Sequence, residues 1–297
     1  MTYAFDWVDA FTTRPYGGNG CVVVHGAESL SVENRLALVR ETRLSECAYV
    51  VPSDKADFGV RYYVAHQEIL MAGHPTIATV TSLVDRGLVD LSQGRACFTL
   101  EVGSGVLPIE VQASADGPVI TMTQAAPEFG EIHDPAEIAA LYGLSASDVV
   151  GVPQTVSTGT PFCITVLRSK AALRRAVLDL DRLAEYHKAR GLDAANAMEP
   201  FLVVREGETE AGQTFSRLLL PPPLPAEDPF TGSATGCMAA YLWHHGLIEK
   251  RRFTAEQGHW MGRPGQAQVE VLGPRQKIDG IKVAGQGVIL MRGELRI

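Results

Sequence analysis

The chain has 297 residues, of which 46% are apolar, and a formal net charge of −8 at pH 7, a length and composition that suit a globular protein with one large core or two smaller ones. An acidic chain whose arginines are scattered has no basic surface for a phosphate backbone, so we expect no nucleic-acid partner. No apolar run reaches the roughly 18 residues of a membrane span, and Asp6 and Asp9 interrupt what would have to be a signal peptide, so we expect a cytoplasmic protein that does not enter a membrane.

Segments rich in β-branched and aromatic residues predict most of the strands. In chain order these segments are 21–24, 48–51, 60–64, 96–102, 119–123, 162–167, 201–204, 215–220, 268–271 and 287–291. More polar segments, at 33–42, 135–142 and 171–189, are typical of helices on the outside of a domain. The presence of both strands and helices along one chain indicates an α+β protein.

The cysteines do not form a recognisable framework. There are five of them, widely spaced and never arranged as C-x-x-C, namely Cys21, Cys47, Cys97, Cys163 and Cys237. An odd number with this spacing predicts buried thiols in a reducing compartment rather than disulfides or a zinc site.

The sequence repeats itself at an offset of 159 residues. Residues 73–76 (Gly-His-Pro-Thr) align with 232–235 (Gly-Ser-Ala-Thr), and the alignment continues without a gap to 87–89 over 246–248. The residues of the first copy that match identically are Gly73, Thr76, Leu83, Gly87 and Leu88. Glycine at both ends of a helix-length segment predicts two equivalent helices, with Gly87 and Gly246 as left-handed C-terminal caps. The alternative is two unrelated helices that both end in Gly-Leu.

Both repeated helices are expected to be buried on every side. Neither 77–84 nor 236–243 contains a charged residue, so neither segment has a face made for water. A strand-like segment precedes each helix. We therefore predict an α+β fold of two pseudo-symmetric lobes, each a curved sheet wrapped around a central helix. The predicted lobes are 1–115 and 116–297, and the final strand, at about 283–297, is expected to return to the N-terminal lobe.

The N-terminal ends of these two helices are the predicted binding site. The first four backbone N–H groups of a helix lack internal partners and carry the positive end of its dipole, so a carboxylate would bind well between two such ends. Gly73 and Gly232 allow close approach of a ligand, and His74 and Ser233 occupy equivalent positions in the repeat. We expect the two ends to face each other across a cleft.

Each of these polar residues also has a simpler interpretation. His74 could be a helix-capping histidine, Thr231 and Ser233 could be ordinary N-caps, and Asp228 could only begin a turn before Pro229. Glu46 opens an otherwise apolar strand, where burial would raise the pKa of its carboxyl and suit it to proton transfer. The alternative for Glu46 is a solvated residue at a strand end.

Motifs for cofactors are missing from the sequence. Neither G-x-x-x-x-G-K-[ST] nor G-x-G-x-x-G occurs, so nucleotide binding has no support. His66 and Glu68 have the H-x-E spacing of zinc deaminases, but no P-C-x-x-C follows them. We therefore expect neither a metal ion nor an organic cofactor.

The chain resembles the PhzF-like isomerases of phenazine biosynthesis, a family similar in fold to diaminopimelate epimerase and proline racemase. The resemblance rests on segments 8–12, 18–20, 44–46, 72–76, 227–234, 257–258 and 261–264. It implies two lobes with the active site in the cleft between them, and commonly a homodimer. It also implies an isomerase that acts on a small carboxylate. In the roles it implies, Glu46 carries the proton, His74 and Asp228 assist, and the substrate is held by Ser45, Gly73, Gly232 and Ser233.

Departures from the family pattern bear on the substrate. The family commonly has Gly-Asn-Pro at 18–20, Phe-Thr-Pro at 63–65 and a small residue at position 230, where this chain has Gly-Asn-Gly, Tyr-Val-Ala and Phe230. These changes are expected to alter the pocket walls.

Two other functions remain open at this point. An epimerase or racemase would need a second base, for which Asp228 is the candidate, but the paired thiols of the related epimerases are missing, because Ala72 precedes Gly73 and Cys237 lies inside the second helix. A non-catalytic binder of small molecules would have no need for Glu46, His74 and Asp228 around an anion site.

Overall fold

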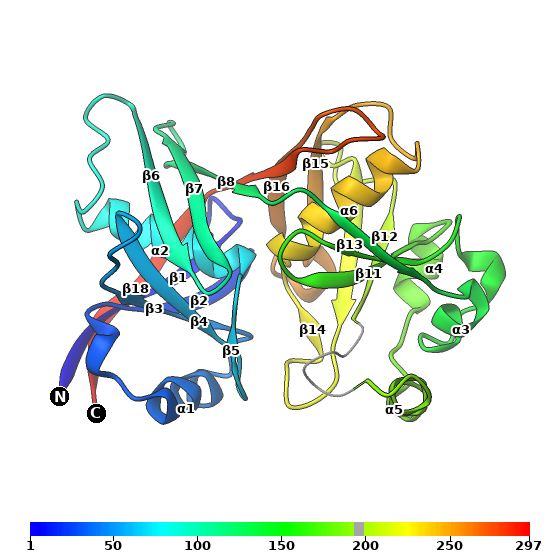
Figure 1. The fold of residues 1–297 in the computed structure, drawn as a ribbon, viewed down its shortest axis with the longest axis horizontal. Helices are drawn as coiled ribbons and strands as arrows, with labels where there is room; N and C mark the ends of the chain where they lie inside the picture. The colour runs from blue at the N-terminus through cyan, green and yellow to red at the C-terminus, as the bar shows by residue number, and fades with distance from the viewer. Residues whose placement is uncertain (193–198) are drawn as a thin grey trace.

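The structure is a computed structural model that describes residues 1–192 and 199–297. Two lobes lie side by side, with helix α2 (Gly73–Asp85) in one and helix α6 (Gly232–His244) in the other (Figure 1). Strands and helices alternate irregularly along the chain, which confirms the predicted α+β class.

The N-terminal lobe is built mostly from the first third of the chain. Its strands are β1 (Thr2–Ala10), β2 (Asn19–Val24), β3 (Cys47–Val51), β4 (Phe58–Tyr63), β5 (Glu68–Ile69), β6 (Arg95–Val102) and β7 (Gly105–Gln112). Helix α1 (Val32–Thr42) lies outside this sheet, and its N-cap is Ser31, whose side chain accepts the N–H of Asn34.

The C-terminal lobe follows β8 (Val119–Gln124). Its strands are β9 (Glu128–Ile132), β10 (Gln154–Ser157), β11 (Pro161–Val166), β12 (Pro200–Val204), β13 (Thr214–Leu219), β14 (Glu227–Asp228), β15 (Arg252–Gln257), β16 (Gly265–Leu272) and β17 (Gly280–Gly285). Its outer helices are α3 (Pro135–Ala140), α4 (Lys170–Arg175) and α5 (Leu180–Ala189).

Helices α2 and α6 are the centres of the two lobes. Every residue of α2 from Gly73 to Leu83 is buried, as is every residue of α6 from Gly232 to Leu242. Helix α2 packs on β1, β2, β3 and β18 (Gly287–Arg296), whereas α6 packs on β10, β11, β16 and β17. Gly87 and Gly246 follow the helices with φ of 69° and 67°, the left-handed conformation that glycine adopts without strain.

Two strand pairings connect the ends of the chain to the rest of the sheet. Strand β18 runs antiparallel to β1, so that Thr2 lies opposite Arg296 and Ala10 opposite Gly287. Both termini therefore lie on the N-terminal lobe (Figure 1). Strand β8 pairs with β7 on one side and with β17 on the other, which joins the sheets of the two lobes. The position of the boundary near residue 115 stays a prediction.

Three local expectations were wrong or incomplete. The segment 171–189 is not one helix, because α4 ends at Arg175 and α5 begins separately, where the Asp179 side chain accepts the N–H of Arg182. Cys97 is exposed, since it lies on the outer face of β6 and the strand alternates between its two faces. Strand β1 was not predicted from its sequence, in which Asp6 and Asp9 hide an otherwise strand-like run.

Within the described residues, no helix combines the length and the apolar character that crossing a membrane requires.

Candidate functional site

A cavity of about 650 Å³ opens where β3, β5 and the N-terminal end of α6 approach one another. Its polar lining residues are Ser45, Glu46, His66, Gln67, Thr160, His187, Glu199, Asp228, Thr231 and Ser233. Its apolar walls are Val64, Ile69, Met71, Pro161, Phe162, Leu192, Leu218, Leu220, Pro221, Pro222, Pro223 and Leu224. An apolar cavity with a few convergent polar groups is the usual form of a small-molecule site.

The two buried helices meet at their N-terminal ends beside this cavity. A Cβ atom added to Gly73 would lie 2.6 Å from both Gly232 Cα and Ser233 N, so the two backbones are in direct contact. The expectation of two glycines facing each other across a cleft is therefore wrong in detail. The helix ends touch, and the cavity lies to one side of their junction.

Within residues 1–192 and 199–297, no side chain caps either helix end. The N-cap of α2 is Ala72, which has no polar group, and the N-cap of α6 is Thr231, whose hydroxyl donates instead to Asp228 Oδ2 at 2.6 Å. The first N–H groups of both helices thus keep their capacity to bind an anion, reinforced by two helix dipoles. Ser233, at the start of α6, lines the cavity.

Glu46 immediately precedes β3 and points into the cavity. Its side chain is 21% exposed, but the Oε2 atom is buried and accepts no hydrogen bond from the described residues. Burial, reinforced by the nearby carboxyls of Asp228 and Glu199, raises the pKa of Glu46 well above its ordinary value. A carboxyl that is unpartnered and reluctant to ionise is suited to accepting and returning a proton.

Asp228 is held by a network of buried hydrogen bonds. Its Oδ1 accepts from Asn19 Nδ2 at 2.9 Å, and Gln257 Nε2 donates to its backbone carbonyl at 2.7 Å. Burial raises the pKa of Asp228, although donation by Thr231 and Asn19 works in the opposite direction. Because both carboxyl oxygens already have donors, Asp228 is positioned more firmly than Glu46 and is less free to take up a proton.

His74 lies on the first turn of α2, behind the part of the cavity wall that contains Glu46 and Asp228. Burial, assisted by the charge of Arg263, lowers the pKa of His74 to about 3, so its ring is neutral near pH 7. Asn19 Nδ2 lies 3.2 Å from His74 Nδ1 and 3.0 Å from the carbonyl of Phe230, which can only accept. The same amide nitrogen lies 2.9 Å from Asp228 Oδ1, so its two protons go to the acceptor oxygens of Asp228 and Phe230, and His74 Nδ1 is a further neighbour of this amide. Glu46 Oε2 is 3.8 Å from the same Nδ1.

The predicted site residues come together, although they do not all reach the cavity. Ser45, Glu46, Asp228 and Ser233 line it, whereas His74, Gly73 and Gly232 form the layer behind.

Sequence reasoning did not assign a role to several residues of this region. They are Asn19, Glu199, Gln257 and Arg263. Asn19, Gln257 and Arg263 lie in segments that carry the family resemblance, so those segments held a usable signal. Glu199 precedes β12 outside any motif, and nothing in its neighbourhood marks it as a site residue.

The departures from the family pattern affect the cavity at one point. Val64 lines the cavity, but Gly20 and Phe230 are absent from the described lining. Phe230 is fully buried and stacks on Phe11, with ring centroids 4.3 Å apart. The expectation that Phe230 shapes a pocket wall was therefore wrong, because its ring fills the core between the lobes.

Cys237 takes no part in the cavity lining that the structure describes. Its thiol is buried on α6 and lies 3.4 Å from Thr158 Oγ1, and burial raises its pKa to about 11. A thiol in this state does not supply the reactive thiolate of a two-cysteine racemase.

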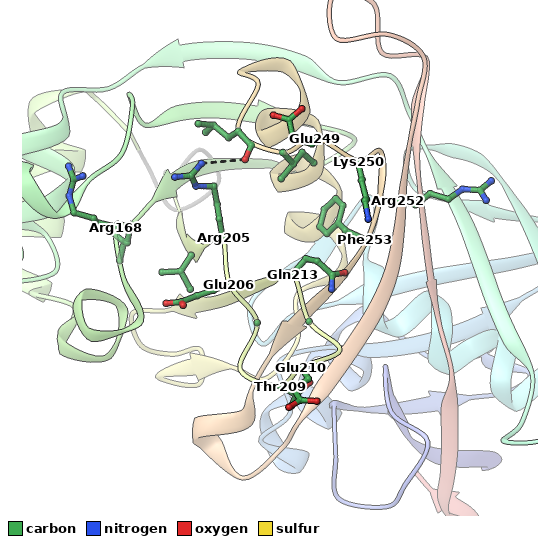
Figure 2. Close-up of a pocket in the computed structure, with 16 residues that line it drawn as sticks. Arg168, Arg205, Glu206, Thr209, Glu210, Gln213, Glu249, Lys250, Arg252 and Phe253 are labelled. Atoms are coloured by element: carbon green, nitrogen blue, oxygen red, sulfur yellow. Dashed lines mark hydrogen bonds between the residues drawn. The ribbon is translucent and has the colours of Figure 1, made fainter.

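A second and larger hollow, of about 910 Å³, lies beyond the C-terminal end of α6. Figure 2 shows its charged rim, which includes Arg168, Arg205, Glu206 and Lys250. Both cationic and anionic side chains line it, and none of the predicted site residues is among the described lining. Elsewhere too, the described residues contain no group of three His, Cys, Asp or Glu side chains arranged to hold a metal ion.

Comparisons with known proteins agree on the family. The family model described as "Phenazine biosynthesis-like protein" (PhzC-PhzF) matches residues 8–293. The uncharacterized isomerase YddE of Salmonella typhimurium is 32% identical, over 98% of this chain and 97% of the relative. The trans-2,3-dihydro-3-hydroxyanthranilate isomerase of Pseudomonas aeruginosa is 28% identical, over 96% of each chain.

Solved structures with the same fold extend the comparison. A Bacillus anthracis phenazine biosynthesis protein of the PhzF family superposes with a TM-score of 0.86, at 26% identity and over the full length of both chains. A hydroxyproline epimerase from Agrobacterium vitis, with bound trans-4-hydroxy-L-proline, shares the fold at a TM-score of 0.68 and 12% identity, over 99% of this chain and 92% of that one. Together with the matching family model, these similarities show that the chain belongs to the phenazine biosynthesis-like, or PhzF-like, family of isomerases.

Proposed function

We propose that this chain is an isomerase that moves a proton between two carbons of a small carboxylate, with Glu46 as its acid and base. The observation that carries the proposal is the position of Glu46. Among the described residues, its buried Oε2 has no hydrogen-bond partner, and no side chain caps the two helix ends next to the cavity. The substrate carboxylate would bind the N–H groups at these ends, and Ser45 and Ser233 would add hydroxyl donors from the cavity wall.

The proton shift would be carried by one side chain. Ionised Glu46 removes a proton from one carbon, becomes neutral, and returns the proton to another carbon of the same bound molecule. The raised pKa favours the first transfer, because a more basic carboxylate is a better proton acceptor. His74, neutral near pH 7 and buried beside Asn19, would keep Glu46 oriented beside the substrate, since its Nδ1 lies 3.8 Å from Glu46 Oε2. No metal ion or organic cofactor is needed for this sequence of steps.

An epimerase that uses Asp228 as a second base is the alternative, and the geometry supports it less. Both carboxyl oxygens of Asp228 accept hydrogen bonds, from Asn19 and Thr231, whereas Glu46 Oε2 accepts none from the described residues. Other expectations, a cytoplasmic location and a homodimer, stay predictions.

The experiment is turnover in heavy water. Small carboxylates are screened for deuterium incorporation by mass spectrometry, beginning with trans-2,3-dihydro-3-hydroxyanthranilate, the compound in the name of the Pseudomonas aeruginosa relative. We expect Glu46→Gln to bind the active compound with similar affinity and to lose a factor of about 10² to 10⁴ in kcat. The matched control is Glu185→Gln, because Glu185 is exposed on α5 and outside the cavity lining.

The result that would overturn the assignment is retention of more than about a tenth of the wild-type kcat by Glu46→Gln, a barrier change of only about 1.4 kcal/mol. Glu46 would then be a structural residue, and Asp228→Asn would be the next variant to measure.

A further inference from the structure

The charges around the cavity are unbalanced. Its described lining contains three carboxyl groups, those of Glu46, Asp228 and Glu199, and neither lysine nor arginine. The helix ends offer a place for one substrate carboxylate, but they do not neutralise a carboxyl group on another side of the cavity. A substrate with negative charge alone would enter a cavity that is already acidic.

Glu199 is the carboxyl group that the proposed reaction leaves without a role. It precedes β12, and its backbone carbonyl accepts the N–H of Cys163 at 3.0 Å, which fixes it where β11 and β12 begin side by side. Its side chain is half-buried and forms no hydrogen bond or ion pair with the described residues. Asp228 differs, since its oxygens are occupied by Asn19 and Thr231.

A separate observation indicates that this cavity binds a polar ligand. The Oε2 atom of Glu46 is buried at the cavity and has no hydrogen-bond partner among the described residues, whereas the buried hydroxyl of Ser45 lies close enough to Asp228 to lower the pKa of that carboxyl. Leaving a buried polar atom unpaired costs about 1–3 kcal/mol, a cost that a ligand at this position would remove. The side chain of Glu199 lines the same cavity.

The ionisation of Glu199 is sensitive to a positive neighbour. Burial, followed by the charge of Asp228, raises the pKa of Glu199 to about 7. An ammonium group at hydrogen-bonding distance would lower this pKa and hold the carboxylate in its ionised form. The resulting charge-assisted hydrogen bond is stronger than one between neutral groups.

We propose that Glu199 is a specificity-determining residue that selects substrates carrying a protonated amine in addition to the carboxylate. The inference rests on the proposed binding of a carboxylate at the ends of α2 and α6. The carboxylate lies on these helix ends, the apolar body of the substrate contacts Phe162 and Leu218, and the ammonium group binds Glu199. Glu46 remains the acid and base of the reaction, and Glu199 positions the substrate.

The test compares matched ligands by isothermal titration calorimetry at pH 8. The probes are cyclohexanecarboxylate and its 2-, 3- and 4-amino derivatives, which share a carboxylate and a ring and differ in the presence and position of an ammonium group. We expect wild type to bind at least one amino derivative about tenfold or more tightly than cyclohexanecarboxylate. In Glu199→Gln this preference disappears, while the Kd of cyclohexanecarboxylate changes by less than about threefold. Glu185→Gln, the same charge change on an exposed residue, keeps the preference.

The outcomes separate this inference from the proposed function. Equal binding of the amino and parent compounds by wild type, or a preference that survives in Glu199→Gln, overturns the role of Glu199 and leaves the carboxylate site intact. Failure of wild type to bind any of these probes overturns the carboxylate site, and the inference with it. Glu199→Asp is the control for misfolding of Glu199→Gln. It keeps the carboxylate on a shorter side chain and should keep part of the preference for the amino derivatives.

Discussion

The two ends of helix α2 bury carboxyl groups in opposite ways. At its N-terminal end, Glu46 and Asp228 have no lysine or arginine among the described residues around their cavity, and burial raises the pKa of both. At its C-terminal end, Asp6 is fully buried and accepts from Arg86 Nε at 2.6 Å and Arg292 Nε at 2.7 Å. Although burial is the largest influence on the pKa of Asp6 and raises it, these partners lower it to about 2.

The difference shows that burial alone does not decide what a carboxyl group does. Asp6 is a structural anchor, because it joins β1, α2 and β18 through Ser82, Arg86 and Arg292. His25, next to it, is kept neutral, since burial and the charge of Arg86 lower its pKa to about 4. The carboxyl groups at the other end have no lysine or arginine in the part of the cavity lining that the structure describes, and they remain able to exchange protons.

The largest effect is expected at the junction of the helix ends. In Gly73→Ala the added Cβ would lie 2.6 Å from backbone atoms of Gly232 and Ser233, and no side chain could move aside to make room. The helices must separate, so we expect a loss of about 3 kcal/mol in the free energy of unfolding and of at least about 10²-fold in kcat. Thermal unfolding and deuterium incorporation measure both quantities. An unchanged melting temperature and rate would show that the two ends do not need to touch.

At the opposite end, Asp6→Asn should be the next most damaging change. The amide keeps the shape of the side chain but cannot balance the charge of two guanidinium groups. We therefore expect the free energy of unfolding to fall by about 2–3 kcal/mol at pH 7. This loss is smaller than for a fully buried ion pair, because Arg292 is 47% exposed. Denaturant unfolding gives this value.

The effect of Asp6→Asn should depend on pH and on burial. Because the folded-state pKa of Asp6 is lowered, the ionised Asp6 side chain stabilises the folded protein above pH 4. This stabilisation should be lost as the pH falls through about 2. Asp85→Asn is the matched control, since Asp85 pairs with the same Arg292 at the surface and should contribute less than about 1 kcal/mol. Equal losses in the two variants would contradict the anchoring role of Asp6.

Glu46→Gln should show the opposite dependence on pH. Because the folded-state pKa of Glu46 is raised, ionisation of Glu46 destabilises the folded protein. The free energy of unfolding of wild type therefore falls as the pH rises above the ordinary pKa range of a glutamate. The variant avoids this loss. We expect it to be more stable than wild type by about 1–2 kcal/mol at pH 8 and equally stable at pH 4, as measured by urea unfolding. A variant less stable than wild type at pH 8 would mean that ionised Glu46 has a stabilising partner.

The smallest effect is expected from Gly87→Ala, just beyond the C-terminal end of α2. The added Cβ would meet nothing within 4 Å, so only the strain of a φ of 69° opposes the change. This strain amounts to about 1 kcal/mol, and kcat should not change. The comparison with Gly73→Ala separates the cost of backbone conformation from the cost of lost space, and a comparable loss of kcat would contradict the separation.

Much of the architecture followed from patterns within short stretches of sequence. The absence of charge in 77–84 and 236–243 predicted two buried helices, and the glycines that follow them predicted how those helices end. These features depend on residues a few positions apart, because helix periodicity and capping are local. Such patterns also predicted that Glu46 begins a strand and that the two helix ends share one site, but not that these ends touch.

What the tertiary structure decided is which polar groups share a buried space. Asn19 and Asp228 are 209 positions apart, yet a hydrogen bond joins them. Glu199 reaches the cavity only because β12 pairs in parallel with β11, and Asp6 is neutralised only because β18 returns to β1. The pKa of a carboxyl group depends on the charges and solvent around it, and these come from segments distant in sequence. The sequence by itself therefore determined the helices and their ends, whereas the tertiary structure determined which carboxyl groups have cationic partners and which do not.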